Sequence, residues 1–126
     1  MKEQKEWKII FYRDKDGNSP VEEFMETLTE SEAEKMETLI EFLEEKGINL
    51  HRPYSDYLRD DIHELRIKLS RGESRTLYFF CYGDYIVLTH TFYKQNDKVP
   101  INEINKALEY KQDFINRYSI NNIEEA

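Results

Sequence analysis

Four basic side chains in the second half of the chain lie at positions from which they could hold one phosphate group. Arg66 and Lys68 are two residues apart in an alternating stretch, so they share one face of the strand that this stretch predicts. Arg75 begins the next predicted strand, and Lys94 follows the third. Arginine offers phosphate oxygens a planar fork of donors, and lysine offers a compact charge. The four residue types together therefore fit a phosphate cradle.

The same four cations also fit an ordinary solvated sheet face. Glu64 and Glu73 lie on the same strands and could balance the positive charge. Aromatic side chains nearby could stack on nucleic-acid bases or fill the protein core, and both interpretations remain open. These aromatic residues are Tyr78, Phe80, Tyr82, Phe92 and Tyr93.

His90 is a further candidate for proton transfer, because an unperturbed histidine titrates at about pH 6.5. It shares parity with Ile86, Leu88 and Phe92, so it could equally be a core histidine. The three histidines lack the spacing of metal ligands, and no Gly-rich phosphate loop or nucleophile elbow is present. The single cysteine, Cys81, lies in an apolar stretch typical of a buried thiol. We therefore expect neither a metal nor a cofactor.

The composition favours one small globular domain. The chain has 126 residues, of which 39% are hydrophobic and 13% aromatic, which is too apolar for a disordered protein. A lone cysteine suits a reducing compartment, and no apolar run is long enough to cross a membrane. Residues 1–6 are charged rather than apolar, which is unlike a secretory signal. These features predict a cytoplasmic protein.

The negative charge is concentrated in one segment. Residues 20–47 hold ten Glu and two Lys, so this segment carries a net charge of −8, equal to that of the whole chain. Residues 62–98 carry a small positive excess. Because phosphate recognition depends on the local field, an acidic chain can still present a basic patch.

Elements of both kinds are predicted. Residues 7–12 are bulky and branched, as in a strand, and Ser19 with Pro20 marks the start of a helix. Ser31 could cap a second helix that ends at Gly47, and residues 48–61 are expected to form a loop. A three-stranded antiparallel meander over 62–69, 74–82 and 85–92 follows. A helix over 100–118 and a frayed tail over 119–126 complete an α+β domain within residues 1–118.

Four stretches of the second half resemble one protein family. They are Ile-His-Glu-Leu-Arg at 62–66, Ser-Arg-Thr-Leu-Tyr-Phe-Phe at 74–80, the run 86–94 with its His-Thr-Phe-Tyr-Lys end, and 99–107 with Pro-Ile-Asn-Glu-Ile. In this order and spacing they are similar to the RelE/ParE toxin superfamily, in its HigB-like branch of phage-derived Gp49-like proteins. Ser74, Thr91 and Gln95 depart from residues that many members carry.

The resemblance implies a RelE-like fold and a toxin of a type II toxin–antitoxin module. Such toxins enter the ribosome and cleave mRNA, and a small helix-turn-helix (HigA-like) antitoxin neutralises them and carries the complex to operator DNA. Carried over residue by residue, the family's motifs select Arg66, Arg75 and Lys94, with His90 as a further candidate catalytic group. Substrate contacts would come from Lys68, Tyr78, Phe92 and Tyr93. Neither a membrane nor a cofactor is implied.

Two other functions remain open at this point. The chain could be a catalytically degenerate antitoxin partner and co-repressor, or a gyrase inhibitor like the ParE branch that shares the fold. Cleavage of RNA requires a base for the 2′-hydroxyl, a hold on the phosphorane charge and an acid for the leaving oxygen. Base and acid could come from Lys94, His90, Tyr93, Glu64 or a ribosomal group.

Overall fold

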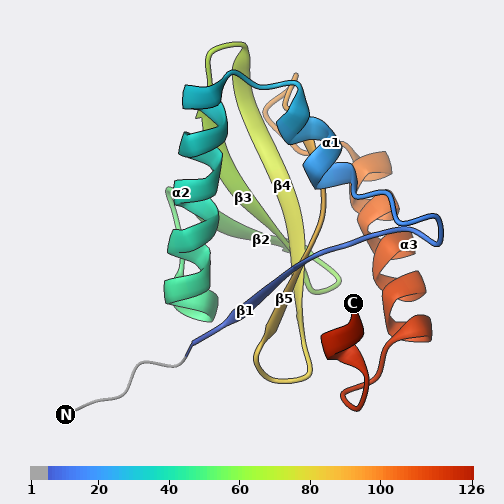
Figure 1. The fold of residues 1–126 in the computed structure, drawn as a ribbon. Coiled ribbons are helices and arrows are strands. Elements are labelled where there is room, and N and C mark those ends of the chain that lie inside the picture. The colour runs from blue at the N-terminus through green and yellow to red at the C-terminus, as the bar shows by residue number, and fades with distance from the viewer. Residues whose placement is uncertain (1–5) are drawn as a thin grey trace.

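A computed structural model describes residues 6–126, in which five strands form one sheet (Figure 1). The strands are β1 (Lys8–Phe11), β2 (Ser55–Arg59), β3 (Ile62–Leu69), β4 (Gly72–Cys81) and β5 (Tyr85–Tyr93), in the spatial order β1-β5-β4-β3-β2. Strand β1 pairs with β5 in parallel, and the other pairs are antiparallel. The α+β class and the three-stranded meander are confirmed, and the arrangement is compatible with a RelE-like fold. The charged start of the chain lies outside the described residues, except for Glu6.

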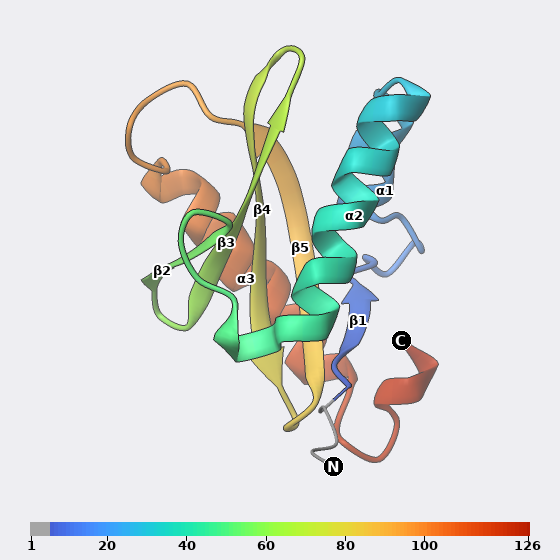
Figure 2. The ribbon, with the colours of Figure 1, turned by 90° about the vertical axis from the view of Figure 1, so that its left-hand side faces the viewer.

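Helices cover both faces of the sheet (Figure 2). Helices α1 (Pro20–Glu26) and α2 (Glu30–Lys46) lie on one face, and α3 (Ile101–Arg117) lies on the other. Each face has its own apolar cluster. Met36 and Leu43 of α2 pack with Leu65 of the sheet, whereas Phe114 of α3 packs with the opposite face. The sheet is therefore a rigid middle layer whose two faces meet different helices.

The helix boundaries follow from side-chain caps. Ser19 accepts a hydrogen bond from the backbone of Glu22, as the Ser-Pro pair predicts. Helix α2 begins earlier than expected, because Thr29 and Glu32 form a capping box that makes Thr29, not Ser31, the first cap. Gly47 ends the helix as predicted, and a Cβ there would come within 2.0 Å of Trp7.

Part of the expected loop over 48–61 is a strand. After a short 3-10 helix (Gly47–Asn49), β2 pairs with β3 through Ser55 opposite Leu65 and ends at a bulge before Arg59. The prediction was wrong because the inward side chain at Ser55 is polar, so the stretch lacks an apolar alternation. Ser55 is nevertheless buried and shares a 2.5 Å hydrogen bond with the hydroxyl of Tyr78.

The end of the chain also differs from the expected frayed tail. A turn and a second 3-10 helix (Ile123–Glu125) follow α3, and Ile123 is 1% exposed in the cluster around Phe114. The hydroxyl of Tyr82 donates to the carbonyl of Tyr118, 2.6 Å away, which fixes the exit from α3. Burial of Ile123 thus anchors this segment to the sheet.

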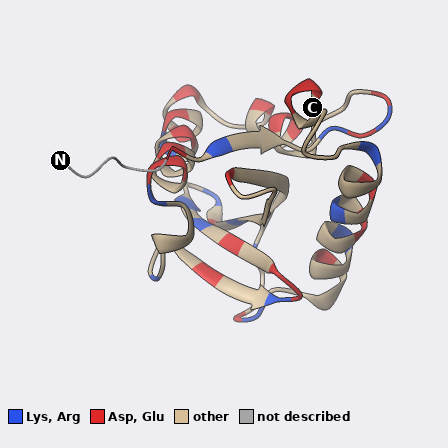
Figure 3. Ribbon diagram, turned by 90° about the horizontal axis from the view of Figure 1, so that it is seen from below, with Lys and Arg blue, Asp and Glu red and all other residues tan. Residues whose placement is uncertain are grey.

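The two sides of the molecule differ in charge. Acidic residues recur along α2, whereas α3 carries both acidic and basic residues (Figure 3). The acidic segment recognised in the sequence is therefore gathered on α1 and α2, on one face of the sheet. Within residues 6–126, no helix is both long and apolar enough to cross a bilayer.

Candidate phosphate-binding groove

A groove of about 530 Å³ gathers the predicted cations. It runs beside the part of β3 that β2 no longer covers, between α2 and the ends of β4 and β5. Five of its lining side chains are basic and one is acidic. They are Lys35, Arg66, Lys68, Arg75 and Lys94, with Glu73 as the acid. The groove is therefore lined by all four predicted cations, which come from β3, from β4 and from the end of β5.

The sheet register places the two arginines together. Arg66 lies directly opposite Arg75 across β3 and β4, and Phe92 lies opposite Arg75 on β5. Opposite residues of an antiparallel pair point to the same face, so the three form a row across the sheet. Lys94 is held beside this row because its backbone N–H donates to the carbonyl of Glu73, 2.7 Å away. The position of each cation is thus fixed by backbone pairing.

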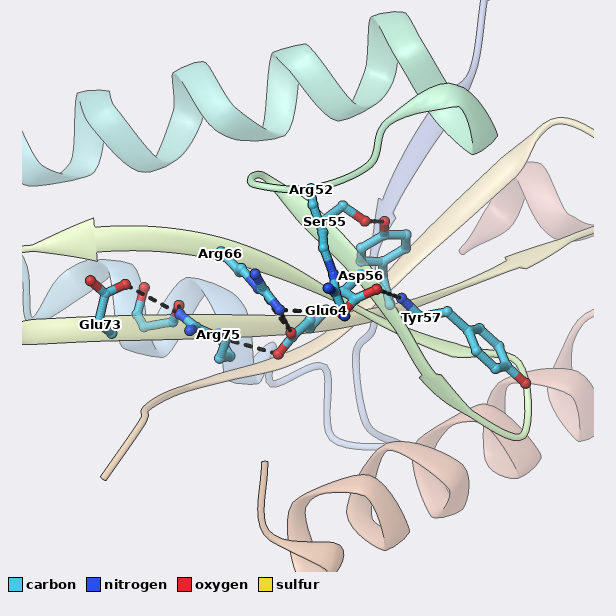
Figure 4. A network of polar contacts seen from close by, with 10 residues as sticks. Arg52, Ser55, Asp56, Tyr57, Glu64, Arg66, Glu73 and Arg75 are labelled. Atoms are coloured by element: carbon cyan, nitrogen blue, oxygen red, sulfur yellow. Dashed lines mark hydrogen bonds and ion pairs between the residues drawn. The ribbon is translucent and has the colours of Figure 1, made fainter. Parts of the chain in front are cut away.

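Glu64 lies buried between the two arginines. Its Oε1 is 3.2 Å from Nε of Arg75, and its Oε2 accepts a 3.0 Å hydrogen bond from Nε of Arg66. Figure 4 shows the arginines converging on this carboxylate from neighbouring strands. Like charges directly opposite each other destabilise a sheet. The glutamate removes that penalty and fixes both guanidinium groups.

Arg75, one of the four cations predicted to hold a phosphate, is largely buried. Its side chain is only 6% exposed. Besides the pair with Glu64, its Nη1 donates to the carbonyl of Ser74 at 2.9 Å and lies 3.5 Å from the half-exposed carboxylate of Glu73. Arg75 forms part of the groove floor, with Glu73 as its outermost partner.

Arg66 is more open and belongs to a longer chain of charges. Its Nη2 lies 3.3 Å from Asp56 on β2, which also accepts two hydrogen bonds from Arg52. The bond from Arg52 lowers the pKa of Asp56 further than burial raises it, so the carboxylate stays charged. About 30% of the Arg66 side chain remains exposed. Two carboxylates thus hold Nε and Nη2 of Arg66, and the exposed part of the side chain can still reach a ligand.

His90 lies outside the groove and is buried. A bulge at Thr89 shifts the register, so that Leu77 pairs with His90 but Tyr78 pairs with Leu88. The extra residue moves His90 to the α3 face, whereas Leu88 points to the α2 face. The alternation in the sequence had placed these two side chains on the same face.

The chemistry of His90 follows from that position. It is 3% exposed, and its ring contacts Phe92 and Tyr110. Burial, together with Lys106, lowers the pKa of His90 to about 4. Glu103 lies 3.4 Å from Nε2, but its attraction does not outweigh burial, so the ring is neutral at pH 7. His90 is consequently a core histidine and not a proton donor for the groove.

The three aromatic candidates are also divided. Tyr78 is 1% exposed on the α2 face, where burial raises its pKa to about 12 and Ser55 shares its hydroxyl. Tyr93 packs against Phe24 of α1 on that same face, with ring centroids 5.2 Å apart. Phe92 is half-buried beside His90. Tyr78 therefore cannot stack on a base, whereas Phe92 lies next to the arginine row.

The sequence did not identify Lys35, which lines the groove, or Asp56, which holds Arg66 from outside it. Lys35 lies in the acidic segment and was counted only in its charge, although it projects from α2 to the groove. Asp56 lies in the stretch expected to be a loop. Helical spacing does offer a signal for Lys35, because it is four residues before Leu39, which lines the same groove.

A known protein family matches most of this chain. The family model for phage-derived Gp49-like proteins (DUF891) matches residues 23–112, which run from α1 through most of α3 and include every lining residue of the groove. A search of curated proteins found no match.

Proposed function

Because the chain belongs to the Gp49-like family of phage-derived proteins, which is a RelE/HigB-like toxin family, we propose that it is the toxin of a type II toxin–antitoxin module. We propose further that it is a ribosome-dependent mRNA endonuclease and that a helix-turn-helix antitoxin neutralises it. The observation that carries this proposal is the convergence of Arg66, Lys68, Arg75 and Lys94 on one groove.

In this proposal the groove binds the scissile phosphate. Arg66 in the row and Lys94 beside it are both partly exposed, and they hold the charge that develops on the phosphorane. Arg75 contributes through Nη1, where a phosphate oxygen replaces its 3.5 Å contact to Glu73. Lys68 and Lys35 extend the positive surface along the RNA backbone.

The proton transfers are restricted by the same geometry. His90 is neutral and buried under α3, and Tyr93 packs against Phe24 of α1, and neither lines the groove. Glu64 is engaged by two arginines. Lys94 and groups of the ribosome remain as candidates for base and acid. Ribosome dependence is then expected, because the ribosome orients the mRNA where the toxin has few acid–base groups, and positioning alone can be worth several kcal/mol.

A second candidate function is supported by the neutralisation of the arginines. Glu64 and Asp56 compensate much of the charge of Arg66 and Arg75, which is also what a non-catalytic antitoxin partner and co-repressor would tolerate. Such a protein would keep the fold and the partner but would not cleave RNA.

Cleavage in a purified system separates the two functions. The chain is mixed with ribosomes programmed with a defined mRNA, and new 5′ ends are mapped by primer extension, with mRNA alone as the control. The toxin proposal predicts cleavage only when ribosomes are present and its loss in Lys94→Ala. Intact mRNA in every reaction with a folded protein would favour the binding partner.

A further inference from the structure

A second cavity, of about 540 Å³, lies on the α2 face where the chain passes from α2 to β2. It is distinct from the cationic groove, with which it shares no lining residue. Its floor consists of the rings of His63, Tyr78 and Phe80, and Ile48 and Tyr57 stand at its sides. Ile48 is 66% exposed and Tyr57 is 53% exposed, although both are large apolar side chains. Exposed apolar groups beside a cavity are typical of a binding site for another molecule.

The rings around this cavity are already arranged for contact. His63 stacks on Tyr78 with ring centroids 5.3 Å apart, and it meets Phe80 and Tyr57 edge to face at 5.1 and 5.2 Å. The hydroxyl of Tyr78 is satisfied by Ser55, so the buried part of the floor needs no polar partner. A ring entering the cavity therefore meets an apolar surface that presents both faces and edges of aromatic rings.

The surroundings of the cavity are negative. Gly47 and Ile48 line it and follow Glu44, Glu45 and Lys46 at the end of α2, where the two carboxylates outnumber the single lysine, which lies 4.0 Å from Glu45. The carboxyl end of a helix adds partial negative charge. The cation that lines the cavity, Arg52, is paired by two hydrogen bonds with Asp56, which also lines it. A polyanion such as RNA is repelled here, whereas a basic segment is attracted.

We propose that this cavity receives an aromatic side chain of a protein partner, from a segment in which basic residues flank that side chain. The aromatic ring packs between Tyr57 and the His63 floor, and the flanking cations meet the acidic end of α2. The partner is the antitoxin, and this identification rests on the proposed function. The docking surface would then leave the cationic groove uncovered, because the two cavities have separate linings.

Short peptides test the chemistry directly. The full chain, labelled with ¹⁵N, is titrated with acetyl-Lys-Phe-Lys-amide, with its alanine analogue acetyl-Lys-Ala-Lys-amide, with acetyl-Glu-Phe-Glu-amide and with uridine monophosphate. The Lys-Phe-Lys peptide should shift the amides of Ile48, Tyr57 and His63 in a saturable manner. It should bind about fivefold more tightly than either peptide control, since one aromatic contact or one favourable charge contributes roughly that factor.

Variants of the cavity residues test where the peptide binds. Tyr57→Ala and Ile48→Ala should each weaken the Lys-Phe-Lys peptide severalfold, and Ile120→Ala, which truncates an isoleucine that is 63% exposed elsewhere, should not. Equal or tighter binding of the Glu-Phe-Glu peptide or of the nucleotide would overturn the proposal, as would an absence of shifts at the three amides. No step involves ribosomes, so a failure here is distinguishable from a failure of the nuclease proposal.

Discussion

Glu64 and Arg75 form an ion pair with almost no exposure to solvent. Nε of Arg75 lies 3.2 Å from Oε1 of Glu64, and the two side chains are 6% and 5% exposed. The pair lies beneath the cationic groove, and Glu64 also binds Arg66. A buried charge that loses its partner is costly, so this pair links the stability of the fold to the geometry of the candidate site.

Removing Arg75 should therefore reduce stability as well as toxicity. Arg75→Ala leaves the carboxylate of Glu64 buried with only Arg66, and we expect a loss of about 3–5 kcal/mol in the free energy of unfolding. Arg75→Lys should also be destabilised, because a point charge cannot keep the contacts to Glu64 and to the Ser74 carbonyl together. Urea unfolding measures both variants.

Arg71→Ala is the matched control, because Arg71 is an exposed arginine between β3 and β4. It should unfold within about 0.5 kcal/mol of the wild type. An Arg75→Ala protein as stable as the Arg71→Ala control would show that the Glu64–Arg75 pair does not support the fold.

Lys94 separates function from stability. It lies at the end of β5, is half-buried and has no carboxylate partner among the interactions described for residues 6–126. Lys94→Ala should lower the rate of mRNA cleavage on the order of a hundredfold, which is typical for the loss of one oriented charge donor, with little change in unfolding. Lys98→Ala, in the exposed loop that follows, should cleave normally. Equal cleavage by the two variants would remove Lys94 from the site.

The meander and the grouping of the cations could be predicted from the sequence because they depend on local patterns. The alternation in β3 places Arg66 and Lys68 on one face, and the short turns make the strands consecutive neighbours. Whether Arg66, Arg75 and Lys94 lie together depended on how the strands pair. The structure brings these three residues to one groove and adds Lys35 from α2.

The rest depended on long-range relations that local patterns do not contain. The bulge at Thr89 reverses the face of His90, and nothing in the residue type marks it, since Thr89 is an ordinary strand residue. Strand β2 is held by a buried hydrogen bond between the hydroxyls of Ser55 and Tyr78 rather than by apolar alternation. The burial of Arg75 requires Glu64 to lie on the neighbouring strand at a diagonal position, which only the register shows.

Tyr78 should affect stability and leave catalysis intact. Tyr78→Phe removes the hydroxyl that Ser55 shares and leaves a buried serine without that bond. We expect a loss of about 1–2 kcal/mol and unchanged cleavage by the folded protein. The double variant Ser55→Ala with Tyr78→Phe should recover part of the loss, because both polar atoms are then gone. A large defect in cleavage by a stable Tyr78→Phe protein would return Tyr78 to the substrate site.

His90 should make stability depend on pH. Its pKa is about 4 in the folded chain and 6.5 when unperturbed, so the unfolded chain binds the proton more readily. Stability is therefore complete above about pH 6.5 and falls as the pH drops toward 4, with about 1.5 kcal/mol lost between pH 6.5 and 5 from this group. The pKa of His63 is lowered in the same direction by burial and adds to the slope.

His90→Gln tests that assignment, because glutamine does not titrate. Urea unfolding at pH 6.5 and at pH 5 should show a smaller difference in the variant than in the wild type. The remaining slope belongs to His63 and the carboxylates. An unchanged pH dependence in a folded His90→Gln protein would mean that His90 is not held neutral by the fold.

We propose that this chain cleaves translated mRNA through the cationic groove. The most direct measurement is a transcriptome-wide map of mRNA 5′ ends after brief induction of the wild type and of Lys94→Ala, with a reporter transcript that is present both with and without its start codon. For the wild type, new 5′ ends are expected inside coding regions. These ends should be absent from the untranslated reporter and from cells expressing Lys94→Ala. New ends that are equally abundant on the untranslated reporter, or no new ends from a folded wild-type protein, would contradict it.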